Sequence, residues 1–205
     1  MNQFFLTSSG DKVLADIAKK LPKNPKEYNV AFITTAAEAK MVDHFWVRNE
    51  KDKFIELGFV VDEFSITDMK VKEIENRLKN KNIIYFTGGS TYWLMNQLIK
   101  TGCDEIIKKM PEEIIFIGSS AGAKIFGQRI DLCTKVDDVI KPDEVRKEGL
   151  KMIDFTIMPH WGSDYFKERF EKGFGQIWTE GLKLLPITNQ QYIWIKDGKV
   201  EFIQV

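Results

Sequence analysis

The residues of this chain best suited to covalent chemistry are Gly118-Ser119-Ser120-Ala121-Gly122, which follow the apolar run 114–117. They fit the pattern G-x-S-x-G, in which a central serine stands at the tip of a sharp turn between a strand and a helix. The flanking glycines make room for the turn, and the backbone N–H after the serine can face an oxyanion. We predict that Ser120, rather than Ser119, is a nucleophile; an ordinary tight connection is the alternative.

A nucleophilic serine needs a base, and the chain has only two histidines, His44 and His160. His44 lies in a helical pattern among aromatic and apolar residues, which favours a structural or surface role. His160 ends the β-like run "FTIMPH" and so belongs to a loop at the carboxyl end of a strand, on the same rim as Ser120. We predict that His160 takes the Ser120 proton and returns it to a leaving group.

The acid that would orient this histidine is harder to choose. The segment 130–149 between the two candidates carries six carboxylates, and geometry must choose among them: Asp131, Asp137, Asp138, Asp143, Glu144 and Glu148. We favour Asp137, with Asp138 as the second choice. A solvated loop carboxylate is the alternative interpretation of either residue.

A second oxyanion donor is predicted in "YFTGGSTYWLMNQL", residues 85–98. A buried strand ends there in Gly88-Gly89 and passes through Ser90 or Thr91, which are good helix N-caps, into a helix. Glycines at such a place allow close backbone approach and direct N–H groups at an anion. A phosphate cradle is the rival interpretation, but neither GxxxxGK[ST] nor GxGxxG is present, which argues against a nucleotide.

The elements that position these residues alternate along the chain. Helical patterns such as residues 41–58 and 68–81 separate six short apolar runs rich in Ile, Val and Phe: 3–8, 29–36, 59–66, 82–89, 113–120 and 154–160. This alternation predicts an α/β fold with a mostly parallel sheet flanked by helices. The last run, "QYIWIKDGKVEFIQV", has Asp197-Gly198 at its centre and predicts an antiparallel hairpin at the sheet edge.

Composition narrows the class of protein. The 205 residues suit one domain, spanning residues 1–205, with a sizeable core. Thirty basic and thirty acidic residues cancel without blocks of like charge, so neither nucleic acid nor an anionic membrane is an expected partner. Cys103 and Cys133 match no metal-ligand pattern and are expected to be free thiols in a reducing compartment. With no signal peptide or membrane helix in the sequence, we expect a cytoplasmic protein.

Taken together, these motifs resemble the peptidase E family, which includes α-aspartyl dipeptidases and the related cyanophycinases. The matching pieces, in order, are "YFTGGSTYWLMNQL", "IGSSAGAKIFG", "DFTIMPHWG" and "PITNQQYIWIKDGKV". The opening runs "QFFLTSSG" and "VAFITTAA" look like the first strands of the family. The resemblance implies a glutamine-amidotransferase-like α/β fold and hydrolysis of peptide bonds without a metal or other cofactor.

Carried over residue by residue, the resemblance implies roles for this sequence. Ser120 would be the nucleophile, His160 the base and Asp137 the acid, with the N–H groups of Gly88 and Ala121 as the oxyanion hole. Gly89 would contact the substrate. The dipeptidase members read an amino-terminal aspartate with a basic residue after the histidine, and the candidates for that role here are Lys167 and Arg169. Arg169 is the better candidate, because its guanidinium can bind a carboxylate through two hydrogen bonds. The alternative interpretation is that both residues are exposed charges on a helix with no role in binding.

Two other functions fit parts of the pattern. An α/β-hydrolase esterase shares the serine turn and the order Ser, acid, His, but only 160 − 120 = 40 residues separate the Ser and the His here. A ligand-binding or regulatory protein that keeps the fold without efficient hydrolysis is the second. A cysteine amidotransferase is disfavoured because the turn carries serine. We expect a short peptide as substrate and a monomer or homodimer.

Overall fold

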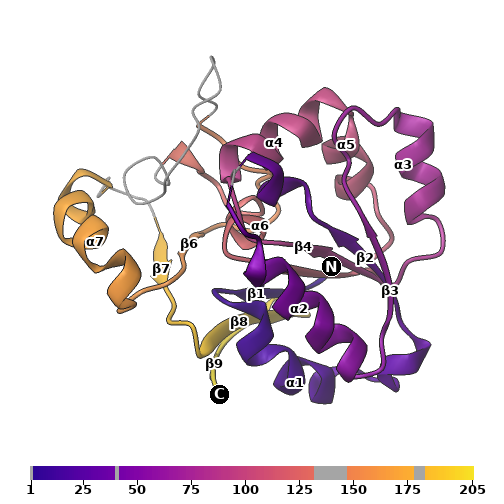
Figure 1. Ribbon diagram of the computed structural model, residues 1–205, viewed down its shortest axis with the longest axis horizontal. Helices are drawn as coiled ribbons and strands as arrows, with labels where there is room; N and C mark the ends of the chain where they lie inside the picture. Colours follow the sequence, from indigo (N-terminus) through magenta and orange to yellow (C-terminus); the bar gives the residue numbers. More distant parts are fainter. Residues whose placement is uncertain (1, 40–41, 132–146, 178–182) are drawn as a thin grey trace.

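A computed structural model of the chain describes all residues except 1, 40–41, 132–146 and 178–182. Seven strands form one sheet in the order β3-β2-β4-β5-β1-β8-β9, in which the first five are parallel and the last two are antiparallel. Their bounds are β1 Gln3–Thr7, β2 Asn29–Ile33, β3 Val60–Phe64, β4 Ile83–Phe86, β5 Ile115–Ser119, β8 Gln191–Lys196 and β9 Lys199–Gln204. This confirms the predicted α/β class with its C-terminal hairpin (Figure 1).

Helices cover both faces of this sheet (Figure 1). One face carries α1 (Gly10–Lys20) and α2 (Phe45–Glu56), and the other carries α3 (Val71–Leu78), α4 (Thr91–Lys100), α5 (Cys103–Lys108) and α6 (Ala121–Lys124). Two 3₁₀ turns, Pro25–Glu27 and Thr35–Ala39, precede and follow β2. Within the residues that the structure describes, no helix is long and apolar enough to cross a membrane.

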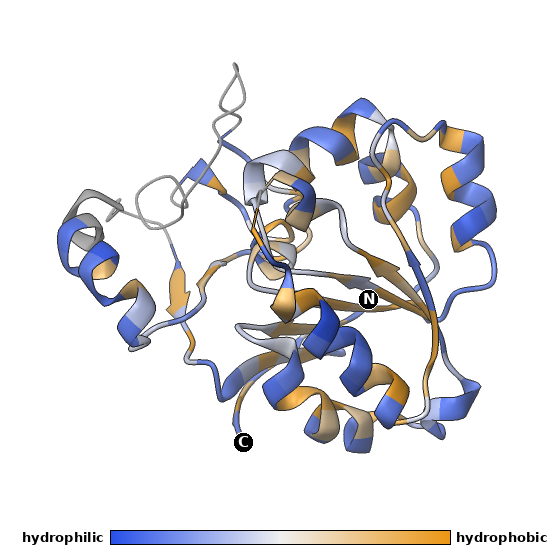
Figure 2. Cartoon of the chain, viewed as in Figure 1, coloured by the Kyte–Doolittle hydropathy of each residue, from blue (hydrophilic) through white to orange (hydrophobic). Residues whose placement is uncertain are grey.

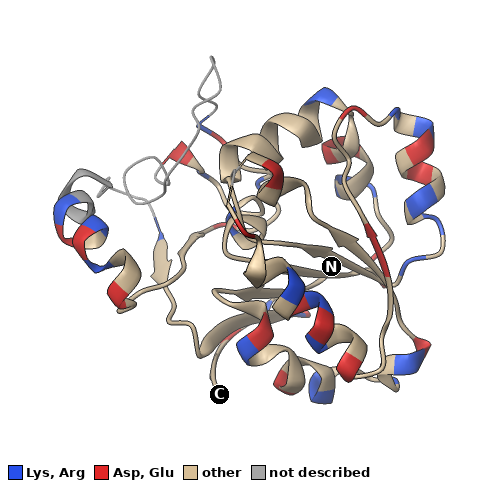
Figure 3. Ribbon diagram, viewed as in Figure 1, with Lys and Arg blue, Asp and Glu red and all other residues tan. Residues whose placement is uncertain are grey.

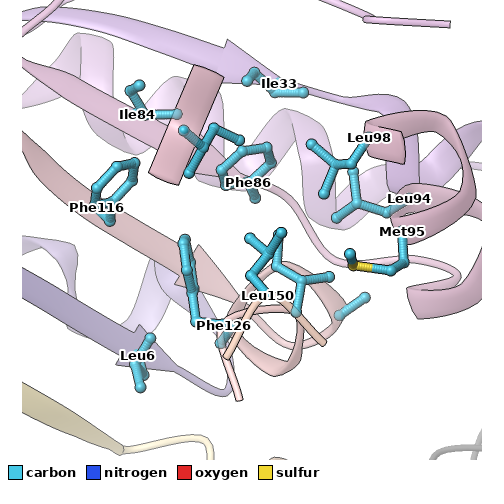
Figure 4. Close-up of a cluster of buried hydrophobic side chains, with 14 of the residues drawn as sticks. Leu6, Ile33, Ile84, Phe86, Leu94, Met95, Leu98, Phe116, Phe126 and Leu150 are labelled. Atoms are coloured by element: carbon cyan, nitrogen blue, oxygen red, sulfur yellow. The ribbon is translucent and has the colours of Figure 1, made fainter. Parts of the chain in front are cut away.

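Each central strand is apolar throughout because both of its faces are buried. Along β4, for example, Ile84 and Phe86 pack toward α4 and α6, whereas Ile83 and Tyr85 pack toward α1 and α2. Figure 4 shows Phe86 beside Phe126 and Leu94 in the first of these layers. The hydropathy colouring shows the same arrangement, with apolar strands inside and polar outer helix faces (Figure 2). Acidic and basic residues are interspersed along those outer helices (Figure 3).

The C-terminal hairpin forms at the turn that the sequence predicts. Asp197 and Gly198 have φ angles of 51° and 74°. Positive φ at both central residues matches the right-handed twist of a two-residue hairpin, which is why Asp-Gly is favoured there. β8 of this hairpin pairs antiparallel with β1, the strand that ends just before Ser8.

The sixth predicted strand lies outside the main sheet. β6 (Thr156–Met158) pairs in parallel with β7 (Leu184–Pro186), and α7 (Asp164–Ile177) follows β6. In the main sheet β8 already occupies the free edge of β1, so no position beside β1 is open to β6. The three elements stand together at one side of the sheet (Figure 1).

Candidate active site

Ser120 lies where β5 ends and α6 begins, as the G-x-S-x-G pattern predicts. Its backbone has φ 49° and ψ −108°. A non-glycine residue in such a conformation costs about 1–3 kcal/mol and persists only where its surroundings hold it. The Ser120 N–H donates to the Thr7 carbonyl at 2.9 Å, which ties the turn to β1. The sequence therefore folds into a strained strand-to-helix turn with Ser120 at its tip.

The two glycines of the pattern are needed for close backbone approach. A Cβ at Gly118 would lie 2.3 Å from the carbonyl oxygen of Gly122. A Cβ at Gly122 would lie 2.1 Å from the carbonyl oxygen of Phe86, at the end of the neighbouring strand. Both distances are too short for any side chain, so the turn packs against its own helix and against β4 only with glycine at these positions.

The His160 side chain meets Ser120 across the end of the sheet. His160 Nε2 lies 2.9 Å from Ser120 Oγ, which is hydrogen-bonding distance. His160 follows β6 by two residues and has φ 64°, so its backbone is turned out of the strand path. The ring of Phe166 stacks on the imidazole with centroids 4.6 Å apart and planes 6° apart. The two residues that the sequence selects as nucleophile and base are thus in direct contact.

Two residues that the sequence did not select hold the other side of this imidazole. His160 Nδ1 lies 2.8 Å from Asn189 Oδ1 and 3.2 Å from Ser8 Oγ. Ser8 also donates to Asn189 Oδ1 at 2.8 Å and accepts from the His160 backbone N–H at 2.6 Å. The position of Ser8 follows from the strand order of the sheet. Ser8 follows β1, the parallel neighbour of β5, so it stands at the same edge of the sheet as Ser120.

The glycines after β4 lie beside the serine turn. A Cβ at Gly88 would be 3.4 Å from the Ser120 Cβ, so this backbone lies beside the candidate nucleophile. Trp46 Nε1 donates to the Gly88 carbonyl at 3.1 Å. Because the C=O and N–H of one trans peptide point in opposite directions, this bond directs the Gly89 N–H away from Trp46. Among the turn, loop and cap hydrogen bonds of the described residues, none has the N–H of Gly88 or Ala121 as donor to a backbone carbonyl.

Comparison with known proteins shows the family of the chain. The model of peptidase family S51 matches residues 4–203. An uncharacterized peptidase of Listeria innocua serovar 6a is 31% identical over 202 residues, covering 98% of this chain and 95% of the relative. An uncharacterized peptidase of Pasteurella multocida is 29% identical over 199 residues, covering 96% and 95%.

Solved structures give the same result. The crystal structure of a candidate peptidase E protein from Listeria monocytogenes EGD-e superimposes with a TM-score of 0.89 at 30% identity, covering 100% of this chain and 99% of that one. The chain belongs to peptidase family S51. It is therefore a serine-type peptidase, and the predicted resemblance to peptidase E is confirmed. A peptidase from an acI-B1 Actinobacterium, at 17% identity and a TM-score of 0.68, shares the fold.

The predicted acid of this S51 peptidase lies outside the described residues, as do Asp138, Asp143 and Glu144. Asp137 therefore stays a prediction. Of the other carboxylates in that segment, Asp131 forms an ion pair with Arg129. Glu148 forms one with Lys151 at 2.6 Å. The Ile130 N–H donates to the Lys147 carbonyl at 2.9 Å, so the chain on either side of residues 132–146 is paired.

Arg169 stands near the base, on α7 of this S51 peptidase. Its guanidinium lies over the rings of Tyr165 and Phe166, 5.3 Å and 5.4 Å from their centroids. Phe166 is the ring that stacks on His160, so Arg169 and His160 flank the same aromatic side chain. Lys167, the other basic candidate, is exposed on the same helix. The structure thus brings Arg169 to the neighbourhood of the serine turn.

A buried carboxyl lies under the serine turn. Glu50, from α2, is 2% exposed, and its Oε1 accepts from the Ser119 hydroxyl at 2.5 Å and from the Gly10 N–H at 3.3 Å. Burial raises the pKa of Glu50 to about 7, although the hydrogen bond from Ser119 opposes that shift. Burial and the nearby Glu50 also raise the pKa of Tyr85 well above its usual value. No sequence pattern indicates this cluster, because Glu50 lies in a charged helical segment.

Proposed function

We propose that this S51 peptidase cleaves the amide bonds of short peptides through an acyl-enzyme on Ser120, with His160 as general base and acid. One observation carries the proposal: Ser120 Oγ, on a strained strand-to-helix turn, lies 2.9 Å from His160 Nε2. A hydroxyl is a weak nucleophile at neutral pH, and a neutral imidazole within hydrogen-bond reach is what activates it.

The reaction runs in two halves. Ser120 Oγ attacks the substrate carbonyl carbon while His160 Nε2 takes the hydroxyl proton, and the carbonyl π electrons move to oxygen. The tetrahedral intermediate collapses, the C–N bond breaks, and His160 gives its proton to the leaving amine. Water then attacks the Ser120 ester with the same base, and the acid product leaves as Ser120 regains its proton.

The oxyanion that forms in both halves needs donors, and we assign them to the backbone N–H groups of Gly88 and Ala121. The Gly88 backbone lies beside Ser120, and Ala121 directly follows Ser120 as the first residue of α6, which supports this assignment. Preorganised donors of this kind contribute about 3–4 kcal/mol each to the lowering of the barrier. Gly89, whose peptide Trp46 holds, is proposed as a backbone contact for the substrate.

The proposed substrates are dipeptide-sized, with an acidic residue at the amino terminus as the favoured class. Arg169 supports this proposal, because it shares the Phe166 ring with His160 and its planar fork matches a carboxylate. A cytoplasmic role in peptide turnover as a monomer or homodimer is part of the same proposal. Asp137 as the third member of a Ser-His-Asp triad is a prediction to be tested with variants.

Hydrolysis of a mixed peptide library tests the function. Dipeptides and tripeptides that include Asp-X, Glu-X and β-aspartyl members are incubated with the wild type and with Ser120→Ala, and products are identified by mass spectrometry. We expect cleavage by the wild type alone. Cleavage by both proteins, or by neither, would contradict the proposal. Ligand-dependent stabilisation without turnover in both proteins would point instead to a binding protein of the same fold.

A further inference from the structure

We propose that Asn189 and Ser8 are positioning residues that fix the tautomer and orientation of His160, so that a neutral side-chain amide does the orienting work beside the base. This inference rests on the proposed function, because it assigns the geometry that the Ser120 and His160 chemistry needs. It concerns two residues to which the sequence analysis assigned no role, from loops that follow β1 and β7.

The hydrogen bonds around Ser8 determine the direction of each proton. The backbone N–H of His160 can only donate, and it donates to Ser8 Oγ at 2.6 Å. Ser8 therefore accepts there and gives its own proton to Asn189 Oδ1, 2.8 Å away. This bond keeps the oxygen of the Asn189 amide turned toward the site. Ser8 is 1% exposed, so its hydroxyl is shielded from bulk water.

The same amide oxygen then selects the imidazole tautomer. Asn189 Oδ1 lies 2.8 Å from His160 Nδ1, and an amide oxygen can only accept, so Nδ1 carries the proton. The neutral ring has one proton on its nitrogens, which leaves the Nε2 lone pair facing the Ser120 hydroxyl at 2.9 Å. Turning the Asn189 amide over would place NH₂ against Nδ1 and force the proton to Nε2, where it would block the base.

An amide beside His160 Nδ1 acts differently from a carboxylate at the same place. A carboxylate there would fix the same tautomer and also stabilise the imidazolium, raising the pKa of the histidine. An asparagine orients the ring without that charge, as in the Cys-His-Asn group of papain-like proteases.

Nuclear magnetic resonance tests the tautomer without any turnover. The chain has two histidines, so His44→Gln, expressed with a histidine-free tag, leaves His160 as the one imidazole. A long-range ¹H–¹⁵N spectrum then reports which ring nitrogen carries the proton. We expect the proton on Nδ1 in this background, and a mixed or reversed population when Asn189→Ala or Ser8→Ala is added. A proton on Nε2 in the parent, or no change in either added variant, would overturn the proposal.

The pH dependence separates orientation from mere structural support. In Asn189→Asp the tautomer is kept and a charge is added, so the acid limb of kcat/KM and the His160 titration are expected to move to higher pH by about one unit or more. In Asn189→Ala we expect kcat to fall more than tenfold with little change in KM. Unfolding curves of each variant show whether a loss of activity comes from a loss of stability. Asn189→Asp is the control of the same size as the native side chain.

Comparison with Asp137 decides which residue orients the base. We expect Asp137→Ala to change the tautomer and titration of His160 less than Asn189→Ala does. The opposite order would overturn the assignment to Asn189 while leaving the Ser120 mechanism intact. A protein whose His160 shows the expected tautomer but whose peptide hydrolysis is absent would sink the proposed function and not this inference.

Discussion

The Ser119 hydroxyl donates a 2.5 Å hydrogen bond to Glu50 Oε1, one residue before the candidate nucleophile and in the interior of the protein. The Gly10 N–H, at the start of α1, reaches both of these oxygens, at 3.2 Å from Ser119 and 3.3 Å from Glu50. This contact joins α1, α2 and the serine turn through one buried carboxyl. The Glu50 Oε2 atom is buried and has no hydrogen-bond partner among the described residues.

The first prediction concerns how stability depends on pH. Burial raises the pKa of Glu50 from 4.5 to about 7, so the folded state holds a proton that the unfolded state releases at lower pH. Its contribution to stability is full below the unfolded pKa and is lost as pH rises through the folded one. Between these two pKa values the free energy of unfolding falls by about 1.4 kcal/mol per pH unit, or about 3 kcal/mol in all.

Glu50→Gln keeps the shape of the protonated side chain and removes this titration. Relative to the wild type, the free energy of unfolding of the variant should rise by about 2.5 kcal/mol between pH 5 and pH 8. Urea unfolding at both pH values measures it, and the comparison with the wild type cancels the other titrating groups. A difference that does not change with pH would show that Glu50 titrates normally.

The second prediction concerns the space at the serine turn. Gly122→Ala would bring a Cβ to within 2.1 Å of the Phe86 carbonyl oxygen, so backbone must move. We expect a loss of stability of about 3 kcal/mol or more and loss of peptidase activity. Gly162→Ala is the matched control: its Cβ would meet nothing within 4 Å, and its φ of +74° costs only about 1 kcal/mol. Equal losses in the two variants would contradict the steric account.

The third prediction concerns substrate preference. If Arg169 reads a substrate carboxylate, Arg169→Met should raise KM for Asp-X and Glu-X peptides about tenfold or more and leave neutral peptides nearly unaffected. Lys167→Met removes the same charge from an exposed position on the same helix and should change both classes little. Kinetics on paired acidic and amide substrates, such as Asp-Leu and Asn-Leu, give the comparison. A uniform loss with all peptides would assign Arg169 to holding the aromatic rings instead.

Much of the fold follows from the sequence because its signals are local. Runs such as "IIYF" and "IIFI" are apolar at every position, which indicates a strand covered on both faces, and Asp197-Gly198 determines the hairpin turn. The separate pairing of β6 with β7 could not be predicted. It depends on which strand occupies the edge of β1, and strand order is a long-range property.

Some residues of the candidate site could likewise be predicted from the sequence, and others could not. Ser120 and His160 carry sequence patterns, and the structure brings them into contact. Asn189 and Ser8 lie within stretches that match the family, but they are loop residues whose proximity arises from the pairing of β1 with β5 and β8, so the sequence alone did not assign them a role. Glu50 was missed because a carboxylate in a charged helix is normally exposed, and only the packing of α2 buries it.

The central claim is that Ser120 forms the acyl-enzyme, and the most direct test is kcat for the best library peptide with Ser120→Ala and Ser119→Ala side by side. The account predicts a fall of about ten-thousand-fold or more for Ser120→Ala, because no other described hydroxyl is placed to replace it. Ser119→Ala should cost about tenfold or less, since it removes one buried hydrogen bond worth about 1 kcal/mol. A Ser120→Ala protein that keeps the wild-type rate would contradict the account.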